Sequence, residues 1–541
     1  MSDRLGALDA SFLHLETPTT AMHVGSVATF AVPAGGTGYY PRLVQQISDR
    51  IGAVPRSRQK LRRVPGGFAH PVWVDDPDFD VGNHVRHSVL PPPGSDAQLR
   101  ELAARIQSRH LDRGRPLWEL HVVHGLSDNR FALITKIHHA TVDGIGGLDI
   151  SRLLFDPAPT APTAPPIPTQ AGPPIPNQDA PPSPNQDAPP SPIPAVPPSP
   201  IPAVPPMQAV PAHAPSPRRL VAEAVLDLAR RPATALAALP RNWAATRTAT
   251  ANALRRVGGV CGATRTLLRP APGSPLNTTI GTPRRYTTAS TRLDDYQRVR
   301  QAHGVTINDV VLATVSGALR GWLHQRGKPV PPTASLRAMV PVNVGAEQRA
   351  DPPGKNVSAY VVELPIGEPD PLRRLGEVCD RLQRHNNAGP SGPTDALITL
   401  ASLVPPPLHT RGARLVGELG RRLFNVVVSN VPGPQLPLYV AGARMLTLHP
   451  VVPLAPGQAV SIGLISYDGD VFYGLNADRD SMPDLDRLAA LIEESLQELV
   501  DTVPRPAHPD VHNPGAAPRL AGPEGTGPVE PPAPPGRPRR A

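Results

Sequence analysis

The stretch "ELHVVHGLSDNRFALITKIHHATVDGIGG", residues 119–147, holds the pattern that decides the fold. Two runs rich in apolar residues, 119–126 and 130–139, flank the polar turn "SDNR", and this pattern predicts an antiparallel hairpin. The second run ends in two adjacent histidines, and an Asp-Gly pair follows. Because imidazole titrates near neutral pH, a histidine at a strand end is suited to act as a general base.

The two histidines are expected to have different roles. Successive residues of a strand point to opposite faces, so His138 and His139 are poorly placed to bind one metal ion. We therefore expect one to face a cleft and the other to be buried, and we predict no metal site. Asp143 is expected to cap a short helix or to pair with an arginine, and Gly144 allows close backbone approach.

Composition divides the chain into folded and unfolded parts. The 541 residues include 75 prolines and 45 glycines, which are very unevenly spread. The net charge of +9 suits an anionic partner such as nucleic acid, a lipid surface or a phosphorylated small molecule. Cys261 and Cys379 are too few for a disulfide framework, so we expect a reducing cytoplasm. We expect neither a secretion signal nor a membrane-spanning helix.

Composition also predicts five segments. A mixed α/β domain is expected over 1–156, a disordered Pro-rich linker with an octapeptide repeat over 157–216, and a basic helical connector over 217–275. A second α/β domain is expected over 276–503 and a disordered tail over 504–541. The linker has an alternative role as a docking site for proline-recognising domains, and the connector as a helix lying on an anionic membrane.

Hydrophobic periodicity places the main elements within the two α/β domains. The expected helices are 39–54, 96–110 and 307–327, and the expected strands are 25–32, 336–344, 356–365 and 423–430. A second hairpin is expected over 459–478, turning at Asp468-Gly469, because an Asp-Gly pair favours a tight turn between strands.

Several motifs together resemble one protein family. His138-His139-x-x-x-Asp143-Gly144 matches the HHxxxDG motif of the bacterial wax ester synthase/diacylglycerol acyltransferase family, part of the CoA-dependent acyltransferase superfamily. Further stretches similar to that family are the opening "LDASFLHLETPTTAMHVG", the PLW motif at 116–118, "TINDVVLA", "MVPVNV" and "NVVVSNVPGP". The resemblance covers about 1–156 and 218–503. The octapeptide insertion and the tail depart from it and put the spacing between the domains in doubt.

The resemblance implies two chloramphenicol-acetyltransferase-like domains with mixed sheets, flanking helices and an active-site tunnel between them. It implies an O-acyltransferase that esterifies diacylglycerol, with long-chain alcohols as a second acceptor, acyl-CoA as co-substrate and no bound cofactor. His139 would be the general base that lets the hydroxyl attack the thioester directly, with His138, Asp143 and Gly144 as structural support. The alternatives are a condensation-type enzyme with another thioester donor, or a non-catalytic protein that binds lipid surfaces.

The resemblance also suggests secondary site residues. Asn308, Asp309, Ser429 and Asn430 are candidate oxyanion or substrate contacts. Each has a structural alternative, because the first pair can cap a helix and the second can end a strand. Trp118 is expected in the core or on the tunnel wall.

Other partners follow from charge and from the resemblance. Arg284-Arg285 or Arg337 could meet the phosphates of CoA. We expect no nucleic-acid partner and a cytoplasmic enzyme held peripherally at the inner face of the membrane or on lipid bodies.

Overall fold

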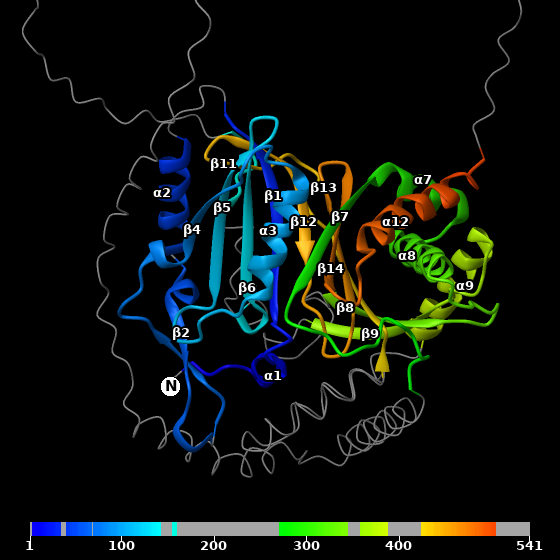
Figure 1. Cartoon of the computed structure of the whole chain (residues 1–541), viewed down its shortest axis with the longest axis horizontal. Coiled ribbons are helices and arrows are strands. Elements are labelled where there is room, and N and C mark those ends of the chain that lie inside the picture. Colours follow the sequence, from blue (N-terminus) through cyan, green and yellow to red (C-terminus); the bar gives the residue numbers. More distant parts are fainter. Residues whose placement is uncertain are drawn as a thin grey trace, which may run out of the picture. The chain divides into compact units, whose positions relative to one another are not determined.

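The computed structural model describes residues 3–33, 39–52, 54–67, 69–141, 154–159, 270–343, 357–387 and 423–504. Asp143 and Gly144 lie outside these residues, as do nearly all of the predicted linker, connector and tail. The described part contains two mixed six-stranded sheets and a two-stranded sheet, together with flanking helices, as expected for the α/β class (Figure 1).

The first large sheet contains the hairpin predicted from residues 119–139. Its strand order is β11-β12-β1-β6-β5-β4. Strands β5 and β6 are antiparallel, β1 runs antiparallel to β6, and β4 runs parallel to β5. The bounds are β1 His23–Ala31, β4 Val85–Val89, β5 Trp118–Leu126, β6 Arg130–His138, β11 Tyr439–Val440 and β12 Ala443–Val451.

The second large sheet contains the predicted hairpin at Asp468-Gly469. Its order is β7-β14-β13-β10-β8-β9. Both turn residues have positive φ, +47° at Asp468 and +87° at Gly469, and such values are typical of a tight two-residue hairpin turn. The bounds are β7 Arg284–Arg292, β8 Leu336–Asn343, β9 Val357–Leu364, β10 Val426–Val431, β13 Val460–Tyr467 and β14 Asp470–Asp478.

The two sheets repeat one strand arrangement. In β1-β6-β5-β4 the successive pairings are antiparallel, antiparallel and parallel, and β7-β14-β13-β10 has the same series. Each half is therefore built around a hairpin flanked by one antiparallel and one parallel neighbour. This repetition confirms the expected similarity of the two halves.

The predicted domain boundaries do not coincide with the sheets. Strand β12, from the second predicted domain, pairs antiparallel with β1 of the first, and Thr29 Oγ1 lies 2.8 Å from Thr447 Oγ1. Periodicity predicts strands but not their distant partners, so a linear division at 156 and 276 misses this exchange. The described residues up to Val503 accordingly form one compact unit.

Helices cover both faces of the first sheet. Helix α2 (Tyr39–Gly52) packs Leu43 and Ile47 against Phe131, whereas α3 (Asp96–Ser108) packs on the opposite face, which carries Ala132. Tyr286 of β7 joins the α3 cluster, so α3 also contacts the second sheet. Helix α3 begins with a capping box made by Ser95 and Gln98, which satisfies free backbone N–H groups.

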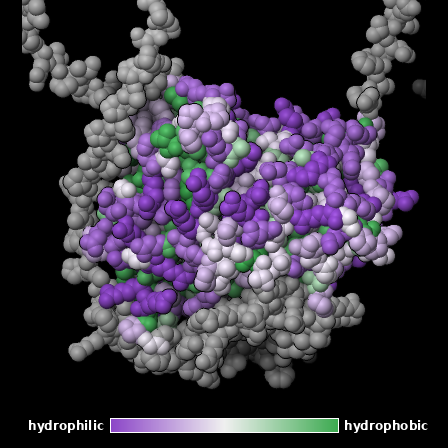
Figure 2. Space-filling model, viewed as in Figure 1, coloured by the Kyte–Doolittle hydropathy of each residue, from purple (hydrophilic) through white to green (hydrophobic). Residues whose placement is uncertain are grey.

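The second sheet is covered by a helical layer on one face (Figure 1). Helices α8 and α12 pack against its strands and against each other, and α7 and α9 pack beside them. In the view of Figure 2 this half is mainly hydrophilic, as expected where amphipathic helices face solvent. The bounds are α7 Leu293–His303, α8 Ile307–Gln325, α9 Pro371–Asn387 and α12 Leu485–Val500.

Shorter elements complete the N-terminal region. The two-stranded sheet pairs β2 with β3, and helix α1 lies where β6 ends (Figure 1). None of the described helices is long and apolar enough to cross a membrane. The bounds are α1 Ala7–Leu15, β2 Gln59–Arg62, β3 Val72–Asp75 and the 3-10 turns η1 Pro55–Arg58, η2 Pro65–Gly67, η3 Val81–Asn83 and η4 His139–Thr141.

Candidate active site

The paired histidines lie at the junction of β6 and η4. His138 is the last residue of the strand and His139 the first of the turn. The backbone N–H of His138 donates to the Leu117 carbonyl at 3.0 Å, and that of His139 donates to the Met22 carbonyl at 2.9 Å. These bonds to segments on both sides fix the backbone at the point where the strand ends.

His138 is a buried and neutral residue. Its side chain is 1% exposed, and its Nδ1 accepts a hydrogen bond from the Ala140 N–H at 3.0 Å. The proton of the neutral ring is therefore on Nε2, which lies 3.7 Å from Oε2 of Glu16. Burial lowers the pKa of His138, and the neighbouring Glu16 only partly opposes this effect. This is the buried member of the pair expected from the sequence.

His139 is the half-buried member of the pair. Its ring stacks on that of Phe12 from α1, with the ring centroids 3.9 Å apart and the planes inclined by 21°. One face of the imidazole is thus covered by an aromatic ring. The expected difference in burial is observed, because His138 is buried and His139 is half-buried. That His139 faces a cleft stays a prediction.

A buried carboxylate, Glu16, lies beside the two histidines. The sequence did not predict it. Its side chain is 5% exposed, and it lies 3.3 Å from His23 and 3.7 Å from His138. Arg113 donates to it through Nε at 3.0 Å and through a second short bond, and His110 lies 4.0 Å away. Burial opposes ionisation, but His138, His23 and Arg113 outweigh it and hold the pKa of Glu16 well below its usual range.

Two further buried groups line the same face of the sheet. His23 pairs with His138 in the register of β1 and β6, and burial lowers its pKa to about 4. Lys136, two residues before His138, is 1% exposed and donates to the Arg109 carbonyl at 2.5 Å. Burial lowers the pKa of Lys136 to about 8. The alternation of β6 could have suggested Lys136, whereas nothing local in the sequence marked Glu16 or His23.

Asn308 and Asp309 lie at the start of α8. Asp309 accepts from the N–H and the hydroxyl of Thr306, both at 2.7 Å, and Thr306 Oγ1 accepts from the Asp309 N–H, which completes a capping box. The structural alternative for Asp309 is therefore observed. Asn308 Nδ2 donates to the Tyr360 hydroxyl of β9 at 3.1 Å. A substrate contact for either residue stays a prediction.

Ser429 and Asn430 lie on β10, within the second sheet. They pair in parallel register with Gly463 and Leu464 of β13, and both side chains are half-buried. The histidines lie on the first sheet, so these candidates come from the other half of the molecule. Their role in substrate binding stays a prediction.

Trp118 is a core residue. It is 1% exposed, its indole N–H donates to the Ser57 carbonyl at 2.8 Å, and it stacks on His84 with centroids 4.6 Å apart. These contacts account for the indole ring by packing. A role on a tunnel wall stays a prediction.

Two of the arginines suggested for CoA, Arg284 and Arg337, have partners within the protein. Arg284 donates to the Thr19 carbonyl through a short bond and to the Gly281 carbonyl at 2.7 Å, and it lies 3.8 Å from Asp478. Arg337 lies 3.4 Å from Glu363. Arg284 therefore ties β7 to the segment that follows Glu16.

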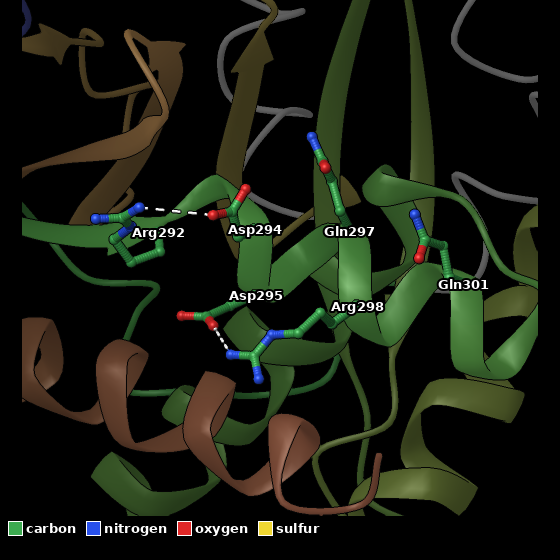
Figure 3. Close-up of a pocket in the computed structure, with 6 residues that line it drawn as sticks. All are labelled: Arg292, Asp294, Asp295, Gln297, Arg298 and Gln301. Carbon is green, nitrogen blue, oxygen red and sulfur yellow. Dashed lines mark hydrogen bonds and ion pairs between the residues drawn. The ribbon is translucent and has the colours of Figure 1, made fainter. Parts of the chain in front are cut away.

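A surface hollow of about 430 Å³ lies at the start of α7, apart from these residues (Figure 3). Arg292 faces Asp294 at 3.5 Å, and Arg298 is paired with Asp295. The hollow is open and shares no residue with the histidine cluster, so we do not regard it as the active site. Within the described ranges, no group of three acidic, histidine or cysteine side chains could hold a metal ion.

The fold and the histidine pair define the class of protein. The two mixed sheets share one strand arrangement, and the hairpin strand of the first sheet ends at the paired histidines. This arrangement is the chloramphenicol-acetyltransferase-like fold. The first condensation domain of the calcium-dependent antibiotic synthetase shares the fold, with a TM-score of 0.51 and 14% identity over 94% of this chain and 97% of that one.

Family models identify the chain more closely. Residues 5–311 match the wax ester synthase/diacylglycerol acyltransferase catalytic domain, and residues 354–500 match the C-terminal domain of that family. The wax ester synthase/diacylglycerol acyltransferase from Marinobacter aquaeolei VT8 is 26% identical with a TM-score of 0.60, over 92% of this chain and 98% of that one. A probable diacylglycerol O-acyltransferase of Mycobacterium tuberculosis, tgs1, is 33% identical over 92% of this chain and 96% of the relative. The chain belongs to this family and is an acyltransferase.

Proposed function

We propose that this enzyme transfers the acyl group of acyl-CoA to diacylglycerol and forms triacylglycerol. The observation that carries the proposal is the position of His139, half-buried at the end of a hairpin strand beside a fully buried, neutral His138. Relatives at 32–33% identity that bear the name diacylglycerol O-acyltransferase support this choice of acceptor. Long-chain alcohols are proposed as a second acceptor, as the name of the Marinobacter relative suggests.

The proposed reaction is direct and needs no covalent enzyme intermediate. His139 takes the proton of the acceptor hydroxyl as its oxygen forms a bond to the thioester carbonyl carbon. The carbon–sulfur bond then breaks, and His139 returns the proton to the CoA thiolate. The reaction uses acyl-CoA as co-substrate without a bound cofactor, and the tetrahedral oxyanion needs donors about 3 Å away. Asn308, Ser429 and Asn430 are the proposed contacts.

The neighbours of His139 have supporting roles in this proposal. His138 stabilises the end of β6, because its ring accepts a hydrogen bond from the Ala140 N–H and lies beside Glu16. Asp143 and Gly144 are proposed to shape the turn after the histidines. A catalytic base that is already held in its reactive orientation loses less entropy on reaching the transition state. This support therefore contributes to the reaction rate and not only to stability.

A lipid product assay tests the function. Purified protein is incubated with labelled palmitoyl-CoA and either diacylglycerol or hexadecanol, and the lipids are resolved. We expect labelled triacylglycerol, and a loss of at least about 100-fold in His139→Ala. The control is His87→Ala, an exposed histidine of β4. No ester from either acceptor, or an unchanged yield from His139→Ala, would contradict the proposal.

Location follows from the proposed acceptors. Diacylglycerol and long-chain alcohols reside in membranes, so we propose that the enzyme works at the inner face of the membrane or on lipid bodies. The arginine-rich segment 217–275 would add attraction to anionic lipid. Co-flotation with anionic but not neutral vesicles, lost at high salt, is the expected result, and equal flotation with both would contradict the role of charge.

A further inference from the structure

Phe12 contacts the proposed base directly. The parallel stack of its ring on His139, 3.9 Å between centroids, places the face of the phenyl group against the imidazole. Helix α1 fixes this contact, because Ala10 and Leu13 are buried in one cluster with Leu117 and Ala140. Phe12 itself is half-buried, so the contact is not explained by core packing alone.

The end of α1 is anchored next to Phe12. The Glu16 N–H donates to the Phe12 carbonyl at 3.2 Å, and the Glu16 side chain is held by Arg113 and faces His23. Phe12 thus lies between a buried apolar face and a buried carboxylate. The backbone that carries the Phe12 ring cannot shift away from His139 without breaking one of these anchors.

The stack changes in strength when His139 takes a proton. The face of a phenyl ring carries negative charge density and attracts a cation whose distance from its centroid is less than about 6 Å. A neutral imidazole does not benefit from this attraction, whereas the imidazolium formed during acyl transfer does. An interaction that strengthens only as the reaction proceeds raises kcat and leaves KM nearly unchanged.

We propose that Phe12 is a positioning residue that holds the His139 ring and stabilises its cationic form while the proton resides there. The proposal rests on the proposed function of His139. In that step the hydroxyl proton moves to the imidazole, the new carbon–oxygen bond forms, and the proton later passes to the sulfur as the carbon–sulfur bond breaks. The phenyl ring takes part in no bond change.

Fluorinated phenylalanines separate electrostatics from packing. Each added fluorine withdraws charge from the ring face with little change in shape, so we incorporate mono-, di- and trifluorophenylalanine at position 12 of the full chain. We expect log kcat to fall with each fluorine, with KM unchanged. Removal of the whole ring face in Phe12→Leu should cost roughly 3- to 30-fold in kcat. Phe12→Trp should retain most of the activity.

A matched control and the parent assay make the result decisive. Phe30 is fully buried and stacks on Phe131 at 5.1 Å, away from the histidines in the sheet core, so the same fluorinated series there should show no trend in kcat. A flat series at position 12, or a loss confined to KM, overturns the inference. If the unmodified protein forms no ester, the proposed function fails. If the activity depends on His139 but kcat does not change along the fluorinated series at position 12, only the role of Phe12 is overturned.

Discussion

At the residue scale, the candidate active site contains a charged group, Glu16, that the proposed reaction does not use. Glu16 is nearly inaccessible to solvent, yet the hydrogen bonds from Arg113 and the nearby rings of His23 and His138 keep its pKa low. A buried carboxylate is costly unless such donors satisfy it. Glu16 directly follows α1 and contacts three other segments. These contacts are to His23 of β1, Arg113 before β5 and His138 at the end of β6.

Replacement of Glu16 by Gln tests this link. The amide keeps the shape but brings an N–H₂ group toward Arg113, so a strong hydrogen bond is lost, at a cost of about 1.5–3 kcal/mol in stability. Release of His138 and of the end of α1 should lower kcat by roughly 10- to 100-fold. Denaturant unfolding and the ester assay measure the two effects. Glu101→Gln, at an exposed position of α3, is the control, and equal behaviour of the two variants would contradict the role of Glu16.

Trp118→Phe separates core packing from a substrate contact. The change removes the hydrogen bond to the Ser57 carbonyl and part of the stack on His84. Because these are packing contacts, we expect a loss of about 1–3 kcal/mol in stability and little change in KM for the acceptor. A severalfold rise in KM with unchanged stability would instead support a position on the tunnel wall.

The sequence predicted the histidine pair but not its surroundings. The strand that ends at His138 follows from its local hydrophobic pattern, which a sequence shows directly. His139 is the first residue of the turn η4, so its different burial comes from the end of the strand and not from alternation along it. Glu16, His23 and Arg113 come together only when three separate segments fold onto the end of β6. No spacing in the sequence shows that these residues are close together, so the sequence pattern alone could not identify the Glu16 carboxylate.

At the element scale, α8 shows how a family motif can coincide with a helix cap. Asp309 and Thr306 satisfy free N–H groups at the N-terminus of a helix whose inner face is deeply buried. The negative carboxylate also lies at the positive end of the helix dipole. These two effects give Asp309 a structural purpose without any contact with substrate.

Asp309→Ala should therefore act on stability and not on chemistry. Loss of the capping box is expected to cost about 1 kcal/mol, with kcat unchanged for the folded enzyme. Thermal unfolding and the ester assay measure the two quantities. Thr333→Ala, at an exposed position before β8, is the control. A large fall in kcat with unchanged stability would instead indicate that Asp309 contacts the substrate.

Hairpins were predictable, whereas distant strand pairing was not. The hairpins β5–β6 and β13–β14 have apolar runs and a short turn within one stretch of sequence. The pairing of β1 with β12 joins residues more than 400 positions apart, such as Thr29 and Thr447. The hydrophobic pattern of a strand does not identify its distant partner, which only the tertiary fold selects.

At the scale of the whole molecule, equivalent strand pairs in the two halves hold polar residues at the same register position, and one of these residues also contacts the other half. His23 pairs with His138 in the register of β1 and β6, and Arg284 pairs with Asp478 in the equivalent register of β7 and β14. Arg284 then reaches across to the Thr19 carbonyl, between Glu16 and His23 in sequence. The second half thus supports the segment that carries Glu16, in addition to lending β12 to the first sheet.

The first sheet also makes the whole fold sensitive to acid. His23, His124 and His449 lie on β1, β5 and β12, and burial lowers the pKa of each to about 4. In the unfolded chain the reference pKa is near 6.5. Between these values the unfolded chain binds more protons than the folded one, so stability falls as the pH falls through this window. The low pKa of Glu16 acts in the same direction below its unfolded value.

Unfolding near pH 5 should accordingly take up at least about three protons, and Tm should drop steeply between pH 6.5 and 4, at about 1.4 kcal/mol per proton per pH unit. Calorimetry in buffers of different ionisation enthalpy measures the uptake. Because His449 is buried and its Nδ1 lies 3.0 Å from the Tyr473 carbonyl oxygen, His449→Gln should lower the proton uptake on unfolding by about one. His324→Gln, at the exposed end of α8, is the control. A Tm that stays constant over this range would show that the three imidazoles are not held neutral by the fold.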